Sequence, residues 1–389
     1  MSQLVEAKDL AFPAVEFQRR LGLVQAEIGR RGQAGLLVFG PQNLFYLTGY
    51  ETIGYANFQF AVVPASGEPR LLVRELEAAP ARKLSWLATE PAAYTDDEDP
   101  IVASQALIEA AGLARANVGI DMNSTSLTVR TFRKFEQALP DATFVDGGGI
   151  VELARRVKSP FELDCFRKAA RYTEAGMAAA IEAVREGAMD NDVGAAAAAA
   201  MYRAGSEYFA SGPTVTTGYR SGVAHTTFQR NRLAAGDAVL IEIGGNHRRY
   251  SSPLMRSAVV GPPSHLAQRM YDACSRALDA AIAAIRPGVT AGEAHDACQK
   301  VIDEAGFEPN FRKRLGYSMG IGFAPGWGEG AFLHLSKGDQ TVLEPGMVFH
   351  MPPALRKYSV VGVGCSETVA VTKDGVEILT SFPRELAVR

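Results

Sequence analysis

The chain has 389 residues, 47% hydrophobic and 21% charged, which is typical of a globular protein long enough for two domains. Its formal net charge of −3 gives no general basic field, so nucleic acid is not expected as a partner. No apolar run reaches the about 18 residues that span a bilayer, so no membrane segment is expected either.

The cysteines favour a reducing compartment. Cys165, Cys274, Cys298 and Cys365 are scattered and form no C-x-x-C pair, which is typical of reduced structural thiols. The start of the chain has an early Glu and Asp and no long apolar core, unlike a signal peptide. We therefore expect a cytoplasmic protein.

The first part of the chain alternates helices and strands. An amphipathic helix over 14–33 leads into a buried strand over 34–40, and the segment 58–74 reads as a hairpin with a Ser-Gly turn. Further helices are predicted over 75–87, 101–114 and 128–138. This alternation indicates an α/β domain, to which we assign residues 1–155.

A different pattern begins near residue 155. Ser159-Pro160 starts a long helix that stops at Gly187, and a second helix runs to about residue 204. Short strands are predicted after this helix pair, over 208–219, 236–245 and 253–260. A second helix pair (263–286 and 290–305) precedes strands over 314–323, 346–351, 361–372 and 375–379. The repeated order predicts an α+β domain over 156–389 with an internally duplicated plan.

Several segments of this second domain carry a family resemblance. They are "RRVKSPFELDCFRKAARYT", "SGVAHTTF", "LAAGDAVLIEIGG", "RRYSSPLMRS", "LGYSMGIGF", "VLEPGMVFHMPP" and "CSETVAVTKDG". In this order and spacing they resemble the creatinase / aminopeptidase P / prolidase family, and the resemblance covers nearly the whole chain. It implies a C-terminal pita-bread domain, with a pseudo-duplicated antiparallel sheet and helices, after a smaller creatinase-like N-terminal α/β domain.

The metal-ligand positions of that family are changed here. Its peptidases hold paired divalent metals with Asp, Asp, His, Glu and Glu. The matching residues of this sequence are Glu242, Pro253, Tyr317, Pro352 and Ser366. Only Glu242 could ligate a hard cation well, so we expect no metal and no cofactor.

The resemblance is greatest to creatinase-like and ectoine hydrolase-like members, which work without metal. It implies a metal-independent hydrolase of a non-peptide C–N bond in a small cationic or zwitterionic amidine or guanidine. The family histidine corresponds to His225, whose near-neutral titration would suit proton transfer. Paired metal ions would repel such a substrate, so their loss is consistent with a new substrate, and equally with decay of the site.

Two carboxylates are further catalytic candidates. Glu242, in the apolar strand "VLIEIGG", could bind the cationic group or attack the amidine carbon; a buried Glu paired with Arg256 is the structural alternative. Glu367 follows the lost ligand position at Ser366. It either replaces that ligand through a local bulge or faces away, because neighbouring residues of a strand point to opposite faces.

Four residues are candidates for substrate binding in the same domain. His350 precedes a double proline that should end its strand at a pocket rim. Tyr317 could donate a hydrogen bond or pack the pocket floor. Trp327 and Glu329, in the glycine-rich "APGWGEG", could hold a delocalised cation, although a plain surface loop is as reasonable.

The resemblance also implies a homodimer in which a loop of the N-terminal domain reaches the partner's active site. The matching stretch is "GYETIGYANFQF", where Tyr55, Asn57 and Phe58 are the candidates. Asn57 stands where creatinase-like proteins use an Arg for the substrate carboxylate, which argues against creatine as the substrate.

Three rival interpretations remain at this stage. The chain could be an Xaa-Pro dipeptidase- or aminopeptidase-like metallohydrolase with non-standard ligands. It could be a catalytically silent pita-bread module that binds a peptide or small ligand. It could also be a C–S lyase of the same fold. The other histidines (His247, His265, His295 and His334) are expected to be non-catalytic.

Overall fold

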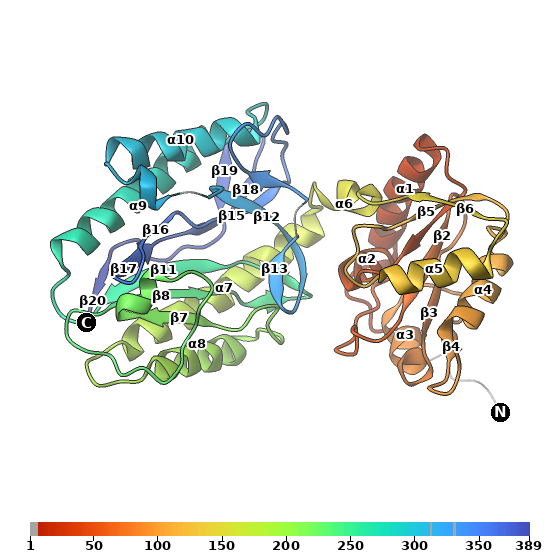
Figure 1. Ribbon diagram of the computed structural model, residues 1–389, viewed down its shortest axis with the longest axis horizontal. Helices are drawn as coiled ribbons and strands as arrows, with labels where there is room; N and C mark the ends of the chain where they lie inside the picture. Colours follow the sequence, from red (N-terminus) through yellow and green to blue (C-terminus); the bar gives the residue numbers. More distant parts are fainter. Residues whose placement is uncertain (1–6, 312, 330–331) are drawn as a thin grey trace. The chain divides into compact units, whose positions relative to one another are not determined.

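The computed structural model describes residues 7–311, 313–329 and 332–389 (Figure 1). The chain divides into two compact units, Met1–Arg155 and Arg156–Arg389.

The first unit is a mixed sheet with helices, as the alternating pattern predicts. Its strand order is β4-β3-β2-β1-β5-β6, with β1 antiparallel to β2 and parallel to β5. The strands are β1 (Gly35–Val38), β2 (Phe60–Pro64), β3 (Arg70–Arg74), β4 (Ala92–Tyr94), β5 (Asn117–Ile120) and β6 (Thr143–Asp146). The helices are α1 (Ala14–Arg30), α2 (Pro41–Thr48), α3 (Ala78–Leu84), α4 (Pro100–Ala110), α5 (Val129–Ala138) and α6 (Ile150–Arg155).

Helix pairs open each half of the second unit, and each half adds antiparallel strands. The first pair is α7 (Pro160–Ala183) and α8 (Asp190–Ala204), and the second is α9 (His265–Ala284) and α10 (Ala291–Glu304). Capping boxes start α7 and α10: Ser159 and Glu162 exchange hydrogen bonds with each other's backbone N–H, as do Thr290 and Glu293. Figure 1 shows the two helix pairs on opposite sides of the strands.

The strands of this unit form separate sheets. One has the order β20-β11-β8-β7, with β7 (Thr214–Thr217), β8 (Ala238–Ile243), β11 (Leu254–Val259) and β20 (Ala387–Val388). The other has the order β19-β18-β15-β12-β10-β9, with β9 (Asn246–His247), β10 (Tyr250–Ser251), β12 (Gly316–Phe323), β15 (Val348–Met351), β18 (Glu367–Val371) and β19 (Val376–Ile378). β13 (Gly326–Gly328) and β14 (His334–Leu335) pair with β12, and β16 (Ala354–Lys357) pairs with β17 (Val361–Gly364).

These elements confirm the expected α+β architecture with its duplicated plan. The strand predicted over 361–372 is wrong in one respect, because the chain leaves the strand conformation at Cys365 and Ser366. β17 and β18 then join different sheets. The strands predicted near 314–323 and 346–351 correspond to β12 and β15, and after the double proline the chain forms a further strand, β16, that was not predicted.

Strand alternation separates a helix-facing side from an inner side in both sheets. Ile241 and Ile243 of β8 pack in the core beneath α7 and α8, whereas Phe349 and Met351 of β15 pack beneath α9 and α10. The intervening side chains of Glu242 and His350 therefore point away from the helices. They approach each other between the sheets, and this is where the candidate site lies.

Candidate active site

Glu242 is a carboxylate without a close partner. It lies near the end of β8, opposite Met255 of β11 and Thr214 of β7, and 21% of its side chain is exposed. Within the described chain its oxygens accept no hydrogen bond, and the nearest basic atom is Nδ1 of His350 at 4.0 Å. Burial raises the pKa of Glu242, against the opposing effect of Lys313, Arg356 and His225.

A neutral hydrogen-bonded network lies beside this carboxylate. The Trp327 Nε1–H donates to the Tyr317 hydroxyl at 2.8 Å, and that hydroxyl lies 2.9 Å from Nδ1 of His350. Nε2 of His350 lies 2.7 Å from the Ser366 hydroxyl. Since the Tyr317 oxygen already accepts from Trp327, its own proton is available to Nδ1, which leaves the imidazole proton on Nε2 facing Ser366.

The electrostatics keep this network uncharged. Burial, together with the nearby cations Lys313 and Arg256, lowers the pKa of His350 to about 3, so its imidazole is neutral at neutral pH. Burial also raises the pKa of the Tyr317 phenol, and the Glu242 carboxylate adds to that shift. His350 consequently serves as a fixed hydrogen-bond relay, and proton transfer near neutral pH needs another group.

His225 is the candidate for that proton transfer. It is exposed in the segment between β7 and β8, and its φ of 56° places it in the left-handed region that non-glycine residues seldom adopt. Its charge interacts with the Glu242 carboxylate. The structure therefore places the two predicted catalytic residues within electrostatic range of each other.

Two cations face the same carboxylate, and the sequence analysis did not identify them. Lys313 and Arg356 both act on the Glu242 charge. The site therefore does not present bare negative charge: one carboxylate faces two cations. The cations come from segments that are not near neighbours in sequence, the stretch before β12 and the strand after Pro352-Pro353. The only available signal was the position of Lys313, just before a predicted strand that carries Tyr317.

Glu367 does not belong to this site, contrary to the catalytic prediction. In the β15–β18 register it pairs with Met351, whereas His350 pairs with Thr368, so Glu367 points to the other face. Its carboxylate is 1% exposed and binds Arg256 at 2.8 Å and Arg384 at 2.9 Å. The alternative that Glu367 faces away is therefore correct, and Arg256 pairs with Glu367 rather than with Glu242.

Glu329 is also a structural residue rather than a substrate ligand. Its carboxylate forms a buried ion pair with Lys158, with the Nζ–Oε2 distance at 2.7 Å, and accepts a hydrogen bond from Ser318. Ser318 neighbours Tyr317 on β12 and so faces the opposite way. The prediction that Glu329 would help to hold a cationic substrate is wrong.

Trp327 lies at the site, but its indole N–H is engaged by Tyr317. Its ring centroid is 6.4 Å from that of His350 in an edge-to-face arrangement. A Cβ added at Gly244 would lie 3.2 Å from Trp327, so the glycine at the end of β8 lets the indole approach. Trp327 therefore forms a wall of the site and fixes the Tyr317 hydroxyl.

The three candidates of the N-terminal loop differ in their surroundings. Phe58 is half-buried and packs against the core of the first unit, with its ring centroid 5.8 Å from Phe60 and 6.2 Å from Tyr94, and its role at a partner's site stays a prediction. Asn57 is exposed and donates to the Gly54 carbonyl in a turn, and Tyr55 is half-buried. A role for Tyr55 and Asn57 at a partner's site stays a prediction.

The donors at the site do not fit a pair of divalent cations. At the ligand positions the chain offers one carboxylate, one phenol, one hydroxyl and two prolines. Among the residues that the structure describes, no three His, Cys, Asp or Glu side chains gather as a metal site would require.

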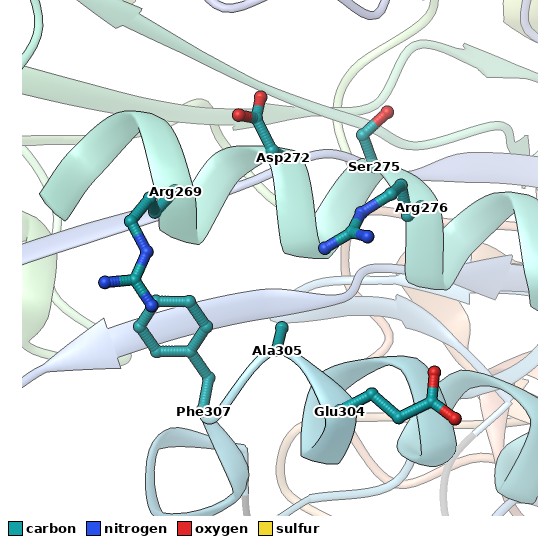
Figure 2. A pocket seen from close by; sticks show the side chains of 7 residues that line it. All are labelled: Arg269, Asp272, Ser275, Arg276, Glu304, Ala305 and Phe307. Carbon is teal, nitrogen blue, oxygen red and sulfur yellow. The ribbon is translucent and has the colours of Figure 1, made fainter. Parts of the chain in front are cut away.

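An open cleft of about 690 Å³ lies elsewhere, between α9 and the end of α10 (Figure 2). The Arg269 guanidinium stands over the Phe307 ring, 5.5 Å from its centroid, and Arg276 and Glu304 flank the cleft. Figure 2 shows Asp272 and Ser275 pointing away from Phe307. Mixed charges that converge on no common point offer no chemistry, so this cleft is not the functional site. No helix of the described residues has the length and apolar character to cross a membrane.

Comparison with known proteins agrees with this architecture. Residues 164–373 match metallopeptidase family M24, and residues 20–157 match the creatinase/prolidase N-terminal domain. An uncharacterised hydrolase/peptidase of Sinorhizobium fredii, y4tL, is 32% identical, with 97% of each chain covered. The ectoine hydrolase of Halomonas elongata is 28% identical, covering 98% of this chain and 99% of its own.

A solved structure of the same family extends the comparison. The dipeptidase PepE of Mycobacterium ulcerans superposes with a TM-score of 0.84 at 28% identity, covering 97% of this chain and 99% of its own. Both units and nearly their full length are therefore matched. The chain belongs to metallopeptidase family M24, the creatinase / aminopeptidase P / prolidase family, as a hydrolase-type pita-bread domain that follows a creatinase-like N-terminal domain.

Proposed function

We propose that this protein is a metal-independent hydrolase of a non-peptide C–N bond in a small amidine- or guanidine-bearing zwitterion, with ectoine as the leading candidate. The observation that supports this most is Glu242, a half-buried carboxylate that has no hydrogen bond within the described chain and lies between two sheets, 4.0 Å from His350. A partly buried carboxylate without a partner costs folding free energy unless a ligand donates hydrogen bonds to it. An amidinium, which is cationic and donates hydrogen bonds, would do so.

The reaction can be written with the side chains present. Glu242 holds the amidinium so that its carbon is open to attack, and a water oxygen adds to that carbon while its proton passes to His225. The C–N bond then breaks, and the imidazolium of His225 returns the proton to the leaving nitrogen. Direct attack of Glu242 on the amidine carbon is the alternative first step, after which water would release the covalent intermediate.

The neutral network beside Glu242 would favour this reaction over metal-assisted chemistry. Tyr317 and Ser366 stand at positions where the family's peptidases place metal ligands, and here both bind His350 instead. They therefore form a rigid, uncharged wall beside the substrate's reacting carbon. The substrate's positive charge is left to interact with Glu242.

A peptidase remains the competing candidate, because relatives named dipeptidase or Xaa-Pro dipeptidase match most of the chain. Peptide hydrolysis in such an enzyme needs an activated water, for which the donor set described above supplies no paired metal. That contrast favours the amidine hydrolase over a peptidase with non-standard ligands.

The test is a product screen of the purified protein with ectoine, creatine, related amidines and an Xaa-Pro dipeptide, with and without added divalent metal. We expect one amidine to be hydrolysed, and His225→Ala to reduce its turnover by at least about 100-fold, in line with the loss of a general acid–base group. His265→Ala, at the exposed start of α9, is the matched control. Cleavage of the dipeptide alone would refute the proposal.

A further inference from the structure

The two cations near Glu242, Lys313 and Arg356, have hydrogen-bond donors without a partner in the described chain. The Lys313 ammonium donates one hydrogen bond, to the Pro352 carbonyl at 2.6 Å, so two of its three N–H groups stay available. The Arg356 guanidinium makes no hydrogen bond and no ion pair with any residue that the structure describes, and its Nε is buried. Neither cation lies within 4.0 Å of a carboxylate in the described chain.

Strand geometry brings Arg356 to the same side of β8 as Glu242. Ala354 of β16 packs with Leu240 of β8 and Met255 of β11 in one small cluster. Leu240 precedes Glu242 by two residues on β8, so these two share a face; Ala354 and Arg356 likewise share a face of β16. The hairpin β16–β17 thus lies over β8, with Arg356 on the side that faces Glu242.

Backbone contacts hold the two cations in place. The Asn310 side-chain amide donates a hydrogen bond to the Arg356 backbone carbonyl at 3.1 Å, which joins β16 to the segment that precedes Lys313. Lys313 in turn binds the carbonyl that precedes β16. These hydrogen bonds fix the position of both residues, while the remaining N–H groups of the two side chains have no partner in the described chain.

Such an arrangement is unfavourable for folding alone. A buried guanidinium Nε without an acceptor costs free energy, and most buried polar groups of native proteins are paired. Two cations near one carboxylate leave one positive charge uncompensated. The missing partner of the two cations is thus an anionic acceptor of hydrogen bonds, held beside the group that Glu242 binds.

We propose that Lys313 and Arg356 form the carboxylate-binding half of the active site, so that the substrate is an amidine or guanidine whose carboxylate lies a few bonds from its cationic carbon. For the cationic end this rests on the proposed function. A carboxylate places a negative charge beside the two cations while the amidinium of the same molecule faces Glu242, so each charged group of the site meets one of opposite sign; a dianionic phosphate would be repelled more strongly by Glu242. The carboxylate also supplies the two acceptor oxygens that a guanidinium binds best.

The test compares ectoine with the same cyclic amidine lacking the carboxylate. We expect the intact enzyme to prefer ectoine in kcat/KM. Arg356→Gln and Lys313→Gln should each reduce kcat/KM for ectoine by about 10- to 100-fold, mainly through KM, because each removes a charged hydrogen-bond donor. Turnover of the carboxylate-free amidine should fall by a clearly smaller factor, through the effect of these cations on the Glu242 charge alone. Lys357→Gln is the matched control, since Lys357 is the exposed neighbour on β16.

Folding of the variants is checked by thermal unfolding. The Arg356 side chain has no partner to lose in the described chain, so Arg356→Gln should unfold at or above the wild-type temperature. Equal losses of kcat/KM for both compounds in Arg356→Gln and Lys313→Gln would overturn the inference while leaving the hydrolase proposal in place.

The pH dependence of kcat/KM tests the contribution of Lys313 separately. Burial and the neighbouring Arg356 lower the pKa of Lys313 to about 8, against the opposing charges of Glu242, Cys274 and Cys298. The ammonium is therefore lost as pH rises through about 8, and kcat/KM for ectoine should fall there. Lys313→Arg should retain activity to higher pH. The same decline with the carboxylate-free amidine would contradict the inference.

A binding measurement separates this inference from the proposed function. If neither compound is hydrolysed, the hydrolase proposal fails, and calorimetry with both compounds then tests the carboxylate site alone. Tighter binding of ectoine that depends on Arg356, and not on Lys357, would support the inference. Equal or undetectable affinities for the two compounds would overturn it.

Discussion

At the scale of single residues, Glu242 is a side chain that the fold does not need. Burial raises its pKa, so its ionised form is less favourable in the folded chain than in the unfolded chain. Above its usual titration range the carboxylate therefore lowers stability, as expected of a group kept for chemistry. Glu367 shows the contrast, because its carboxylate is fully engaged by Arg256 and Arg384.

We predict that Glu242→Gln abolishes turnover, by at least about 100-fold, without lowering stability at pH 7. The amide keeps the shape of the side chain and removes the unpaired charge, so the unfolding temperature should stay equal or rise. Glu385→Gln, near the exposed end of the chain, is the control for removal of one negative charge. A clear fall in stability would show that Glu242 has a structural partner after all.

His350 predicts a specific pH dependence of stability. Its pKa is about 3 in the folded chain and near 6.5 when unfolded, so between these values the unfolded chain binds the extra proton. Stability is therefore lost as pH falls from about 6.5 toward 3, by about 2 kcal/mol between pH 7 and pH 5 from this residue. Denaturant unfolding of wild type and His350→Gln at both pH values measures it.

The control for this prediction is His265→Gln at the exposed start of α9. The wild type should lose more stability than His350→Gln on acidification, by the amount given above, and His265→Gln should behave as wild type. Parallel losses in all three proteins would mean that His350 takes up its proton as readily in the folded chain as in the unfolded one.

At the scale of elements, one buried ion-pair cluster joins three segments. Glu367 at the start of β18 binds Arg256 of β11 and Arg384 of the C-terminal segment, and it accepts a hydrogen bond from Thr380. Arg256 also donates to the carbonyls of Pro383 and Phe382. This cluster holds the C-terminal segment against both sheets on the side away from Glu242.

We predict that Glu367→Gln destabilises the protein by about 3–5 kcal/mol, because it leaves buried Arg256 without its carboxylate. The kcat of the folded protein should change by less than about tenfold, since Glu367 does not face the site. Glu344→Gln is the control, because its ion pair with Arg156 is half-exposed and should contribute little. Denaturant unfolding and initial rates below the unfolding transition give both quantities.

The elements themselves were largely predictable, because they follow local patterns. Both helix pairs, with their Ser159 and Thr290 capping signals, appear within a few residues of the predicted bounds. The single strand predicted over 361–372 was wrong because nothing in the local sequence marks its interruption. Neither Cys365 nor Ser366 is a glycine or proline, yet the chain passes from one sheet to another there. An apolar run does not reveal which sheet it joins.

The site was only partly predictable, because it depends on the register of paired strands and on contacts between residues that are far apart in the sequence. Whether Glu367 or Ser366 lies on the side of the candidate site depends on a single residue of strand alternation, which the pairing of β18 with β15 decides. Arg356 lies on the side of β8 that carries Glu242 because Ala354 packs with Leu240, a contact across more than a hundred residues. Nothing local in "ALRK" marks it as part of a site, whereas His225 and Glu242 stand within recognisable family motifs.

At the scale of the whole molecule, we propose a homodimer in which the loop containing Tyr55 and Asn57 completes the partner's site. Mixing tests this. In a heterodimer of Glu242→Gln and Tyr55→Ala chains, one site would combine an intact Glu242 with an intact loop. Co-refolded mixtures should thus regain about a quarter of wild-type activity if exchange is random. Light scattering should give a mass near twice that of the 41.6 kDa chain.

Several outcomes would contradict the proposal that the loop completes the partner's site. A monomeric mass would exclude it. A dimer in which Tyr55→Ala keeps full activity, or in which mixing restores none, would mean that the loop does not serve the neighbouring site. The matched control is a mixture of Glu242→Gln with His225→Ala, where both changes lie in the same catalytic unit. In that mixture every site carries one of the two defects, so no recovery is expected.

The most direct test of the account is the hydrolysis of ectoine by protein that has been treated with a chelator and assayed for bound metal. Product formation is followed by NMR before and after addition of divalent manganese, cobalt or zinc. The account predicts ring opening with less than one metal ion per chain, unchanged by added metal and absent in Glu242→Gln. Activity that appears only when about two metal ions bind per chain would contradict it.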